Sequence, residues 1–72
     1  MRKVDPLMHD RLCEELWKLG DSHREISEKI GCHQKTIYAW ITQGYIPSGH
    51  HFANFHRVGM DIIYILTGER HV

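Results

Sequence analysis

Residues 22–40 read SHREISEKIGCHQKTIYAW, and this stretch decides the fold that we expect for the chain. Ser22 opens an S-x-x-E capping box, which is a sequence that begins helices. Ile26 and Ile30 follow four residues apart, on one face of the helix that would begin there. Gly31 suits the left-handed backbone position at which helices commonly end. The pattern predicts a short amphipathic helix followed by a tight turn.

A second amphipathic run follows that turn. Ile37, Trp40 and Ile41 recur at intervals of three and four residues, which is the spacing of one helical face. Two helices joined by so short a connection form a helix-turn-helix, whose second helix can enter the major groove of DNA. We therefore predict a helix-turn-helix over about residues 22–41.

The flanking sequence predicts three further short helices. Asp5-Pro6 begins the first, because Asp caps a helix and Pro suits its first turn. Its core-facing stripe comprises Met8, Leu12, Leu16 and Leu19. Pro47-Ser48 begins a fourth helix, the last helix covers about residues 61–67, and residues 69–72 are expected to fray. The predicted fold class is all-α, a compact bundle of about five short helices that forms a single domain over residues 1–72.

Two segments of the chain resemble a known family. In the helix-turn-helix, the matching residues are Arg24, Glu25, Glu28, Lys29, Ile30, Gly31, Lys35, Thr36, Ile37 and Trp40. Residues 59–70, GMDIIYILTGER, are similar to the last helix and the LTGER ending of phage-repressor DNA-binding domains. The chain thus resembles the lambda-repressor-like (Xre-type) family, which includes phage repressors and Cro proteins. The resemblance implies the lambda-repressor-like DNA-binding fold and double-stranded DNA as the partner.

The expected DNA contacts fall into two sets. Bases would be read by the early positions of the second helix, which are Gln34, Lys35, Thr36, Tyr38 and Ala39. The DNA backbone would be held by His23, Arg24, His33, Thr42, Gln43 and Tyr45. Gln suits bidentate contact to adenine, Lys suits guanine, and Ala can touch a thymine methyl group. Polar residues on any exposed helix look similar, and it is the resemblance that favours base reading.

Two histidines depart from the family pattern. His23 stands where the family usually has a Gln that helps to hold a phosphate, and a ring nitrogen can keep part of that role. His33 stands where the family has a Ser or Thr as N-cap of the second helix, and a weaker cap costs about 1 kcal/mol. His33 either caps the helix or replaces the cap with a phosphate or base contact, and the sequence leaves both open. Cys32 stands at an apolar position of the turn and is expected to be buried.

The charge balance is unusual for a DNA-binding domain. Nine basic and nine acidic residues cancel, whereas such domains often have a basic excess. Between Glu28 and Asp61, however, the chain has no acidic residue but contains Lys29, Lys35, Arg57 and four histidines. This acid-free segment, unless it arises by chance, supports DNA contact with a weaker electrostatic component than usual. Its histidines predict binding that strengthens as the pH falls from about 7.5 to 6.

The last helix has apolar residues on all sides, whereas a short surface helix needs only one apolar face. The surplus predicts a dimer contact formed by Ile62, Ile63, Ile65 and Leu66. In the family this region commonly supports dimers, so the resemblance implies a homodimer. The alternative is a helix that is fully buried in the monomer.

Other classes of protein have less support. His50, His51 and His56 are five or six residues apart or adjacent, which does not place them on one helical face, and Cys13 and Cys32 lie in no metal-binding spacing. The chain has no glycine-rich phosphate loop, nucleophile elbow, membrane-spanning run or secretory signal. We therefore expect no metal, cofactor, small-molecule ligand or enzymatic activity, and a cytoplasmic location in a bacterium or phage-infected cell.

The function we expect is sequence-specific regulation of transcription. The chain would be a small phage- or prophage-type repressor or Cro-like protein that binds a palindromic operator as a dimer. One alternative is a protein-interaction module with the repressor fold that has weak or no specific DNA binding and titrates a related repressor. A recombinase- or transposase-like DNA reader is a further alternative, against which the LTGER ending argues.

Overall fold

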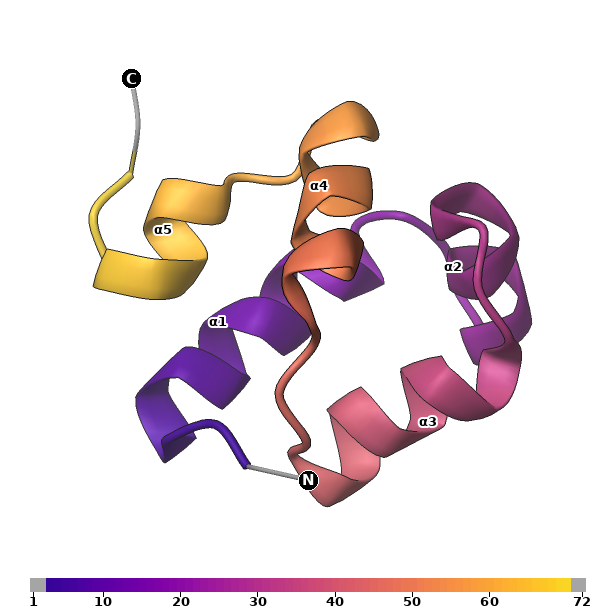
Figure 1. Ribbon diagram of the computed structural model, residues 1–72, viewed down its shortest axis with the longest axis horizontal. Coiled ribbons are helices and arrows are strands. Elements are labelled where there is room, and N and C mark those ends of the chain that lie inside the picture. The colour runs from indigo at the N-terminus through magenta and orange to yellow at the C-terminus, as the bar shows by residue number, and fades with distance from the viewer. Residues whose placement is uncertain (1–2, 71–72) are drawn as a thin grey trace.

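The computed structural model of the protein describes residues 3–70, which form five α-helices around one core (Figure 1). The helices are α1 (Pro6–Trp17), α2 (His23–Ile30), α3 (Gln34–Gln43), α4 (Gly49–Arg57) and α5 (Ile62–Thr67). The predicted all-α class and number of helices are confirmed. Among residues 3–70 the only extended pairing is an isolated antiparallel bridge between Lys3 and Tyr45. Every helix within these residues is too short or too polar to cross a membrane.

The predicted helix starts have the expected caps, with one exception. Asp5, Ser22 and Asp61 each accept a hydrogen bond from the backbone N–H three residues later, at 3.0, 3.1 and 3.0 Å. These side chains satisfy N–H groups that have no partner inside the helix. Ser48 makes no such bond, and its hydroxyl instead lies 2.9 Å from Nδ1 of His51. Three of the predicted helix starts thus follow from local sequence, whereas the start of α4 uses a different contact.

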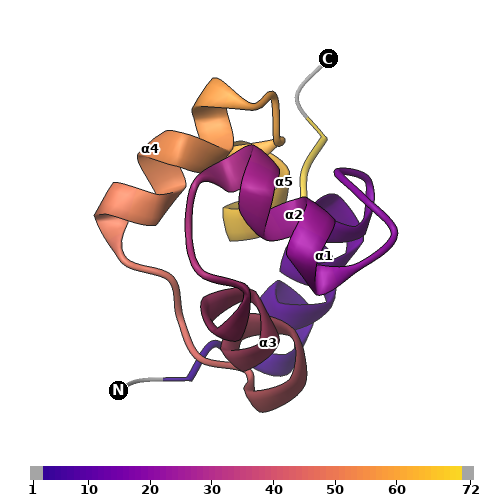
Figure 2. The same ribbon diagram turned by 90° about the vertical axis from the view of Figure 1, so that its right-hand side faces the viewer.

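The five helices enclose a small apolar core. α1 packs against α3 and α5, α2 packs against α3 and α4, and α4 contacts α5 (Figures 1 and 2). The buried apolar residues are Leu12, Leu16, Ile26, Ile30, Ile37, Trp40, Phe55, Met60 and Ile65. Every helix contributes at least one of them, and each fully buried side chain of this size stabilises the fold by about 1.5–3 kcal/mol. These contacts link the five helices in a ring around the core, in which α1 has α3 on one side and α5 on the other.

The ends of two helices are held by arginine side chains from other elements. Nη2 of Arg57 donates to the carbonyl oxygen of Ile30 at 3.1 Å, and Nε of Arg11 donates to that of Ile65 at 3.0 Å. The last carbonyls of a helix have no partner within it and carry partial negative charge, which a cation stabilises. Arg57 was counted from sequence among the cations of the acid-free segment. In the fold, its side chain is engaged in joining α4 to α2.

The expectation that residues 69–72 fray was wrong for Arg70; residues 71 and 72 lie outside the described residues. The guanidinium of Arg70 lies 2.9 Å from a carboxylate oxygen of Glu15 and also pairs with Glu14. It stacks over the ring of Tyr64 at 3.6 Å from the centroid. These contacts tie the end of the described chain back onto α1. The sequence showed the Arg but not the carboxylates that it would meet.

Glu15 is a buried carboxylate that joins three segments of the chain. One carboxylate oxygen accepts the backbone N–H of Asp61 at 3.0 Å, and the other lies 2.8 Å from Nζ of Lys18. Burial alone would raise the pKa of Glu15. The hydrogen bonds from Lys18, from the N–H of Asp61 and from Arg70 outweigh burial, and the pKa is lowered. Glu15 is therefore charged at neutral pH, and it holds the start of α5 on α1.

Candidate nucleic-acid interface

α2 and α3 are joined by three residues, 31–33, and pack directly against each other (Figure 2). Gly31 has a φ of 87°, in the left-handed region that was predicted for it. The N–H groups of Gly31 and Cys32 both donate to the carbonyl oxygen of Ser27, at 2.8 and 3.1 Å. Ser27 is itself buried. Cys32 was expected to be buried but is only partly so, because it packs at the edge of the core.

α3 turns its apolar residues inward and most of its early polar residues outward. Ile37 and Trp40 are 0% and 3% exposed, as expected. Gln34, Lys35 and Tyr38 are exposed, and Tyr38 keeps half of its surface accessible. The other two predicted base-reading residues, Thr36 and Ala39, are half-buried.

The five predicted base-reading residues border two hollows. One, of about 300 Å³, is lined by Gln34, Lys35, Tyr38 and His23. The other, of about 560 Å³, lies on the side of the loop after α3. It is lined by Lys35, Thr36, Ala39, Trp40, Ile46, Pro47, Ser48 and His51. Lys35 borders both hollows, and it is the only cation of the described chain that lines either of them.

His23 lies between two exposed aromatic rings. Its ring centroid is 5.6 Å from that of Trp17, on α1, and 5.9 Å from that of Tyr38, on α3. His23 is thus placed beside α3 at the N-terminal end of α2, where a backbone contact was expected. Trp17 is 43% exposed and was not among the predicted contacts. Its position off the apolar stripe of α1 was the only signal in the sequence.

His33 acts as a cap on α3. Its Nδ1 accepts the backbone N–H of Lys35 at 3.0 Å, so the lone pair is on Nδ1 and the neutral ring carries its proton on Nε2. Of the two roles left open by the sequence, capping is the one present here. The Nε2–H of this exposed residue is not used by the cap and can donate to a phosphate.

The remaining predicted backbone contacts are less free than the sequence suggested. The Thr42 hydroxyl donates to the carbonyl oxygen of Tyr38 at 2.6 Å, within its own helix. Tyr45 is half-buried and lies under Nζ of Lys3, 5.8 Å from its ring centroid. Gln43 is exposed at the end of α3. Arg24 is also exposed, with only a loose ion pair to its own helix at 3.8 Å, so its guanidinium can turn to a phosphate.

His51, which lies near α3, has a lowered pKa. His51 packs its ring against Trp40, with centroids 4.8 Å apart. Burial, and then the neighbouring His50, lowers the pKa of His51. His51 therefore takes up its proton only below the ordinary imidazole range. The predicted strengthening of binding at lower pH then depends on the other histidines of the segment.

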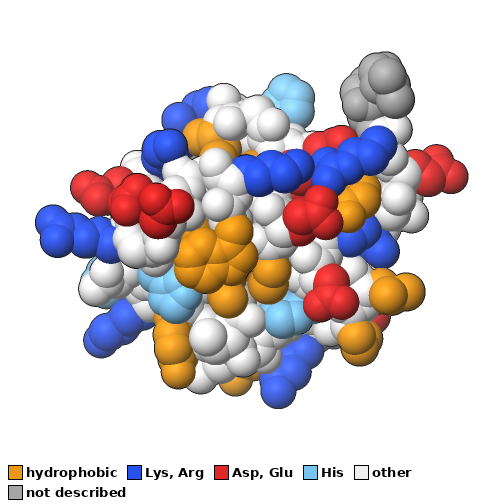
Figure 3. Space-filling view, turned by 180° about the vertical axis from the view of Figure 1, so that it is seen from behind, with side chains coloured by type: hydrophobic (Ala, Val, Ile, Leu, Met, Phe, Trp, Pro, Cys, Tyr) orange, Lys and Arg blue, Asp and Glu red, His pale blue; other side chains and the backbone are white. Residues whose placement is uncertain are grey.

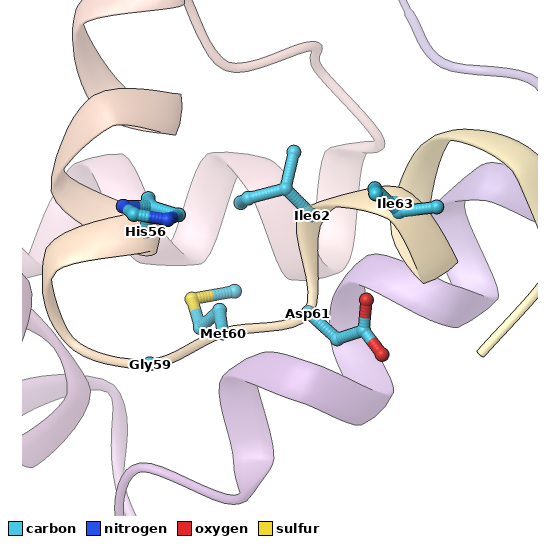
Figure 4. A pocket seen from close by; sticks show the side chains of 6 residues that line it. All are labelled: His56, Gly59, Met60, Asp61, Ile62 and Ile63. Carbon is cyan, nitrogen blue, oxygen red and sulfur yellow. The ribbon is translucent and has the colours of Figure 1, made fainter. Parts of the chain in front are cut away.

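The predicted dimer contact on α5 needs a correction. Ile65 is fully buried in the core of the monomer and cannot contact a partner, and Ile62 is half-buried. Ile63 and Leu66 are 47% and 52% exposed, so the alternative of a fully buried helix is wrong as well. A hollow of about 480 Å³ lies beside Ile63, at the loop that leads into α5 (Figure 4). It is lined by His56, Gly59, Met60, Asp61, Ile62 and Ile63.

The surface charge is mixed on one face of the molecule (Figure 3). On the face seen in Figure 3, acidic and basic side chains lie close together around a hydrophobic patch. Among residues 3–70, no group of three or more His, Cys, Asp and Glu side chains is placed to hold a metal ion.

Comparisons with protein-family models, with curated proteins and with solved structures gave no match. The residues and geometry of α2 and α3 are therefore what bears on function.

Proposed function

We propose that this protein is a sequence-specific DNA-binding regulator of transcription, a small phage- or prophage-type repressor or Cro-like protein of the lambda-repressor-like family. The observation that carries the proposal is the arrangement of α3. After a three-residue turn from α2, it anchors Ile37 and Trp40 in the core and leaves Gln34 and Lys35 exposed in its first turn. In a helix-turn-helix, the N-terminal residues of the second helix contact base edges.

The chemistry around α3 suits the two kinds of contact that such a reader needs. Gln34 and Lys35 can form hydrogen bonds to adenine and guanine in the major groove. His23, Arg24 and the Nε2–H of His33 stand at the N-terminal ends of α2 and α3, where helix dipoles favour phosphate. Phosphate contacts would fix the register, and α3 would read the sequence.

We further propose that two copies pair through the exposed residues of α5, Ile63 and Leu66. A two-fold symmetric pair would place its two α3 helices in successive major grooves about 34 Å apart. Replacing Ile63 by Glu should shift the protein toward monomer in sedimentation experiments. Ile46→Glu is the matched control, because Ile46 is an exposed isoleucine in the loop after α3. An unchanged mass for Ile63→Glu would contradict this interface.

The decisive experiment is selection of bound sequences from a random library of double-stranded DNA, with the full chain as bait. A palindrome would support both base reading and pairing, and a single half-site would support base reading alone. The double variant Gln34→Ala, Lys35→Ala is the control, because both side chains are exposed and their loss should spare the fold. Enrichment of the same sequence by this variant would mean that α3 is not the reading element.

A protein-interaction module with the repressor fold is the second candidate. The chain has no net charge, and the side chains of Arg11, Arg57 and Arg70 are engaged inside the fold. Both facts reduce the long-range attraction to DNA. A salt titration separates the candidates, because each neutralised phosphate makes binding weaken more steeply with salt. No selected sequence and no salt dependence would favour the interaction module.

A further inference from the structure

The C-terminal turn of α3 is held by a side chain of α1. The last four carbonyls of a helix have no partner within it, and in α3 these belong to residues 40–43. Nε2 of His9 lies 3.1 Å from the carbonyl oxygen of Trp40 and 2.8 Å from that of Ile41. One imidazole thus serves two of the four carbonyls, across 31 and 32 residues of sequence.

This geometry fixes where the ring carries its proton. Both carbonyl partners are acceptors, so Nε2 must be a donor, and the tautomer with its proton on Nδ1 alone would lose both hydrogen bonds. Sγ of Cys13 lies 3.4 Å from the same nitrogen. Burial, and then the charge of Asp10, raises the pKa of the Cys13 thiol, which therefore stays neutral beside the ring. The partial negative charge of a helix C-terminus also favours a donor here.

The same end of α3 has a second attachment to the start of the chain. The N–H of Val4 donates to the carbonyl oxygen of Gly44 at 2.9 Å. Gly44 ends α3 with a φ of 72°, and a Cβ built there would lie 4.0 Å from the His9 ring. The N-terminal end of α3, by contrast, is capped within its own chain segment by His33. The C-terminal turn of α3 is thus held on α1 by the side chain of His9, beside the backbone hydrogen bond from Val4.

We propose that His9 is a positioning residue for α3. It makes no contact with DNA, but it fixes the C-terminal turn of the helix on α1 and thereby the orientation in which Gln34 and Lys35 meet the bases. The inference rests on the proposed function for its consequence in binding. The anchoring of α3 itself can be measured without DNA.

Two substitutions at this position separate the hydrogen bonds from the packing. His9→Leu puts an apolar side chain of moderate size in its place and removes the donor. His9→Gln restores one, because its amide nitrogen is as many bonds from Cα as Nε2 of His. Leu7→Gln is the control, since Leu7 is 69% exposed on the same helix and belongs to no proposed contact. All variants are made in the full chain.

Three measurements follow. Nitrogen NMR of the wild-type ring should show a proton on Nε2 of His9. Amide hydrogen exchange of Gly44 and Tyr45, whose N–H groups donate to the carbonyl oxygen of Ala39, should speed up about tenfold in His9→Leu. The affinity for the selected DNA should fall by about three- to tenfold in His9→Leu and recover in His9→Gln. Leu7→Gln should match the wild type in exchange and affinity.

The outcomes separate this inference from the proposed function. A proton on Nδ1 alone, or unchanged exchange at Gly44 and Tyr45, would overturn the anchoring of α3. Faster exchange with unchanged affinity would overturn the positioning role in binding. If the wild type selects no DNA, the proposed function fails, and faster exchange with recovery in His9→Gln would still establish that His9 positions α3. If His9→Leu does not fold, His9→Gln and the ring proton decide the question.

Discussion

The α1–α5 end of the molecule and the α2–α3 half use their polar groups in opposite ways. At the α1–α5 end, charged side chains face one another: Glu15 is buried and meets Lys18 and Arg70, and Arg70 also stacks on Tyr64. In the α2–α3 half, the internal contacts come mostly from neutral groups. Ser22 and His33 cap the two helices, and the more strongly polar side chains of α3 point outward.

This difference bears on how net charge relates to the proposed DNA binding. A cation that is paired inside the fold stabilises it but adds little to the attraction of a distant phosphate. Arg57 belongs by sequence to the acid-free segment, yet it holds the end of α2. The positive field around α3 therefore depends more on Lys35 than the sequence count suggested.

The two neighbouring isoleucines of α5 should differ most. Ile65 is fully buried and Ile63 is 47% exposed. Ile65→Ala should lower the free energy of unfolding by about 2–4 kcal/mol, because it removes core packing and leaves a cavity. Ile63→Ala should change it by less than about 0.5 kcal/mol. Urea unfolding followed by circular dichroism measures both, and similar losses would contradict the placement of α5.

The adjacent glutamates of α1 offer the next contrast. Glu15→Gln should lower the free energy of unfolding by about 1–2 kcal/mol, a modest loss because Lys18 and Arg70 are partly in solvent. Glu14→Gln should cost less than about 0.5 kcal/mol, since Glu14 is exposed. Thermal unfolding at pH 7 measures the difference. Equal losses would mean that burial of Glu15 is not what matters.

Glu15 should also make the stability of the fold depend on pH. The pKa of Glu15 is lowered in the fold, so its ionised form contributes stability above the ordinary carboxyl value of about 4.3. This contribution is lost as the pH falls through the lowered folded pKa. The difference in free energy of unfolding between wild type and Glu15→Gln should therefore be largest at pH 7 and should decrease in acid. A difference that is constant from pH 7 to acid would contradict the charged network.

In the α2–α3 half, the two exposed lysines should differ in DNA binding. Lys35 borders both hollows of α3, whereas Lys29 lies in the last turn of α2. Lys35→Ala should reduce discrimination between selected and unrelated DNA by about 1–2 kcal/mol. Lys29→Ala should spare that discrimination. Fluorescence anisotropy with the selected and the unrelated DNA measures this discrimination. If Lys35→Ala weakened binding to the two DNAs equally, Lys35 would make a non-specific contact.

The smallest effect is expected at the cap of α3. His33→Ala removes the acceptor for the Lys35 N–H and should lower the free energy of unfolding by about 1 kcal/mol. His33→Ser should recover that loss, because a Ser hydroxyl can accept an N–H of the first turn of α3. Urea unfolding of the three proteins at neutral pH provides the comparison. Equal stability of wild type and His33→Ala would mean that the ring does not cap.

The local features of the fold were accessible from the sequence because their causes are local. The S-x-x-E box placed the start of α2, Gly31 placed its end, and the spacing of Ile37 and Trp40 gave the inward face of α3. The sequence did not reveal the contacts between segments that are distant along the chain. His9 is an ordinary polar residue of α1 by sequence, and only the packing of α1 on α3 brings it to two free carbonyls.

The sequence by itself determined five helices, their approximate limits and the exposed polar positions at the start of α3. Periodicity, caps and left-handed glycines act over a few residues and can be read directly from a single chain. The tertiary structure alone decided that Ile65 lies in the core while Ile63 lies at the surface. It also decided that Arg70 pairs with carboxylates of α1, and which cations are engaged inside the fold. Those outcomes depend on which groups meet across tens of residues. For residues 22–40, the sequence specified the two helices, and the fold decided what holds the second helix in place.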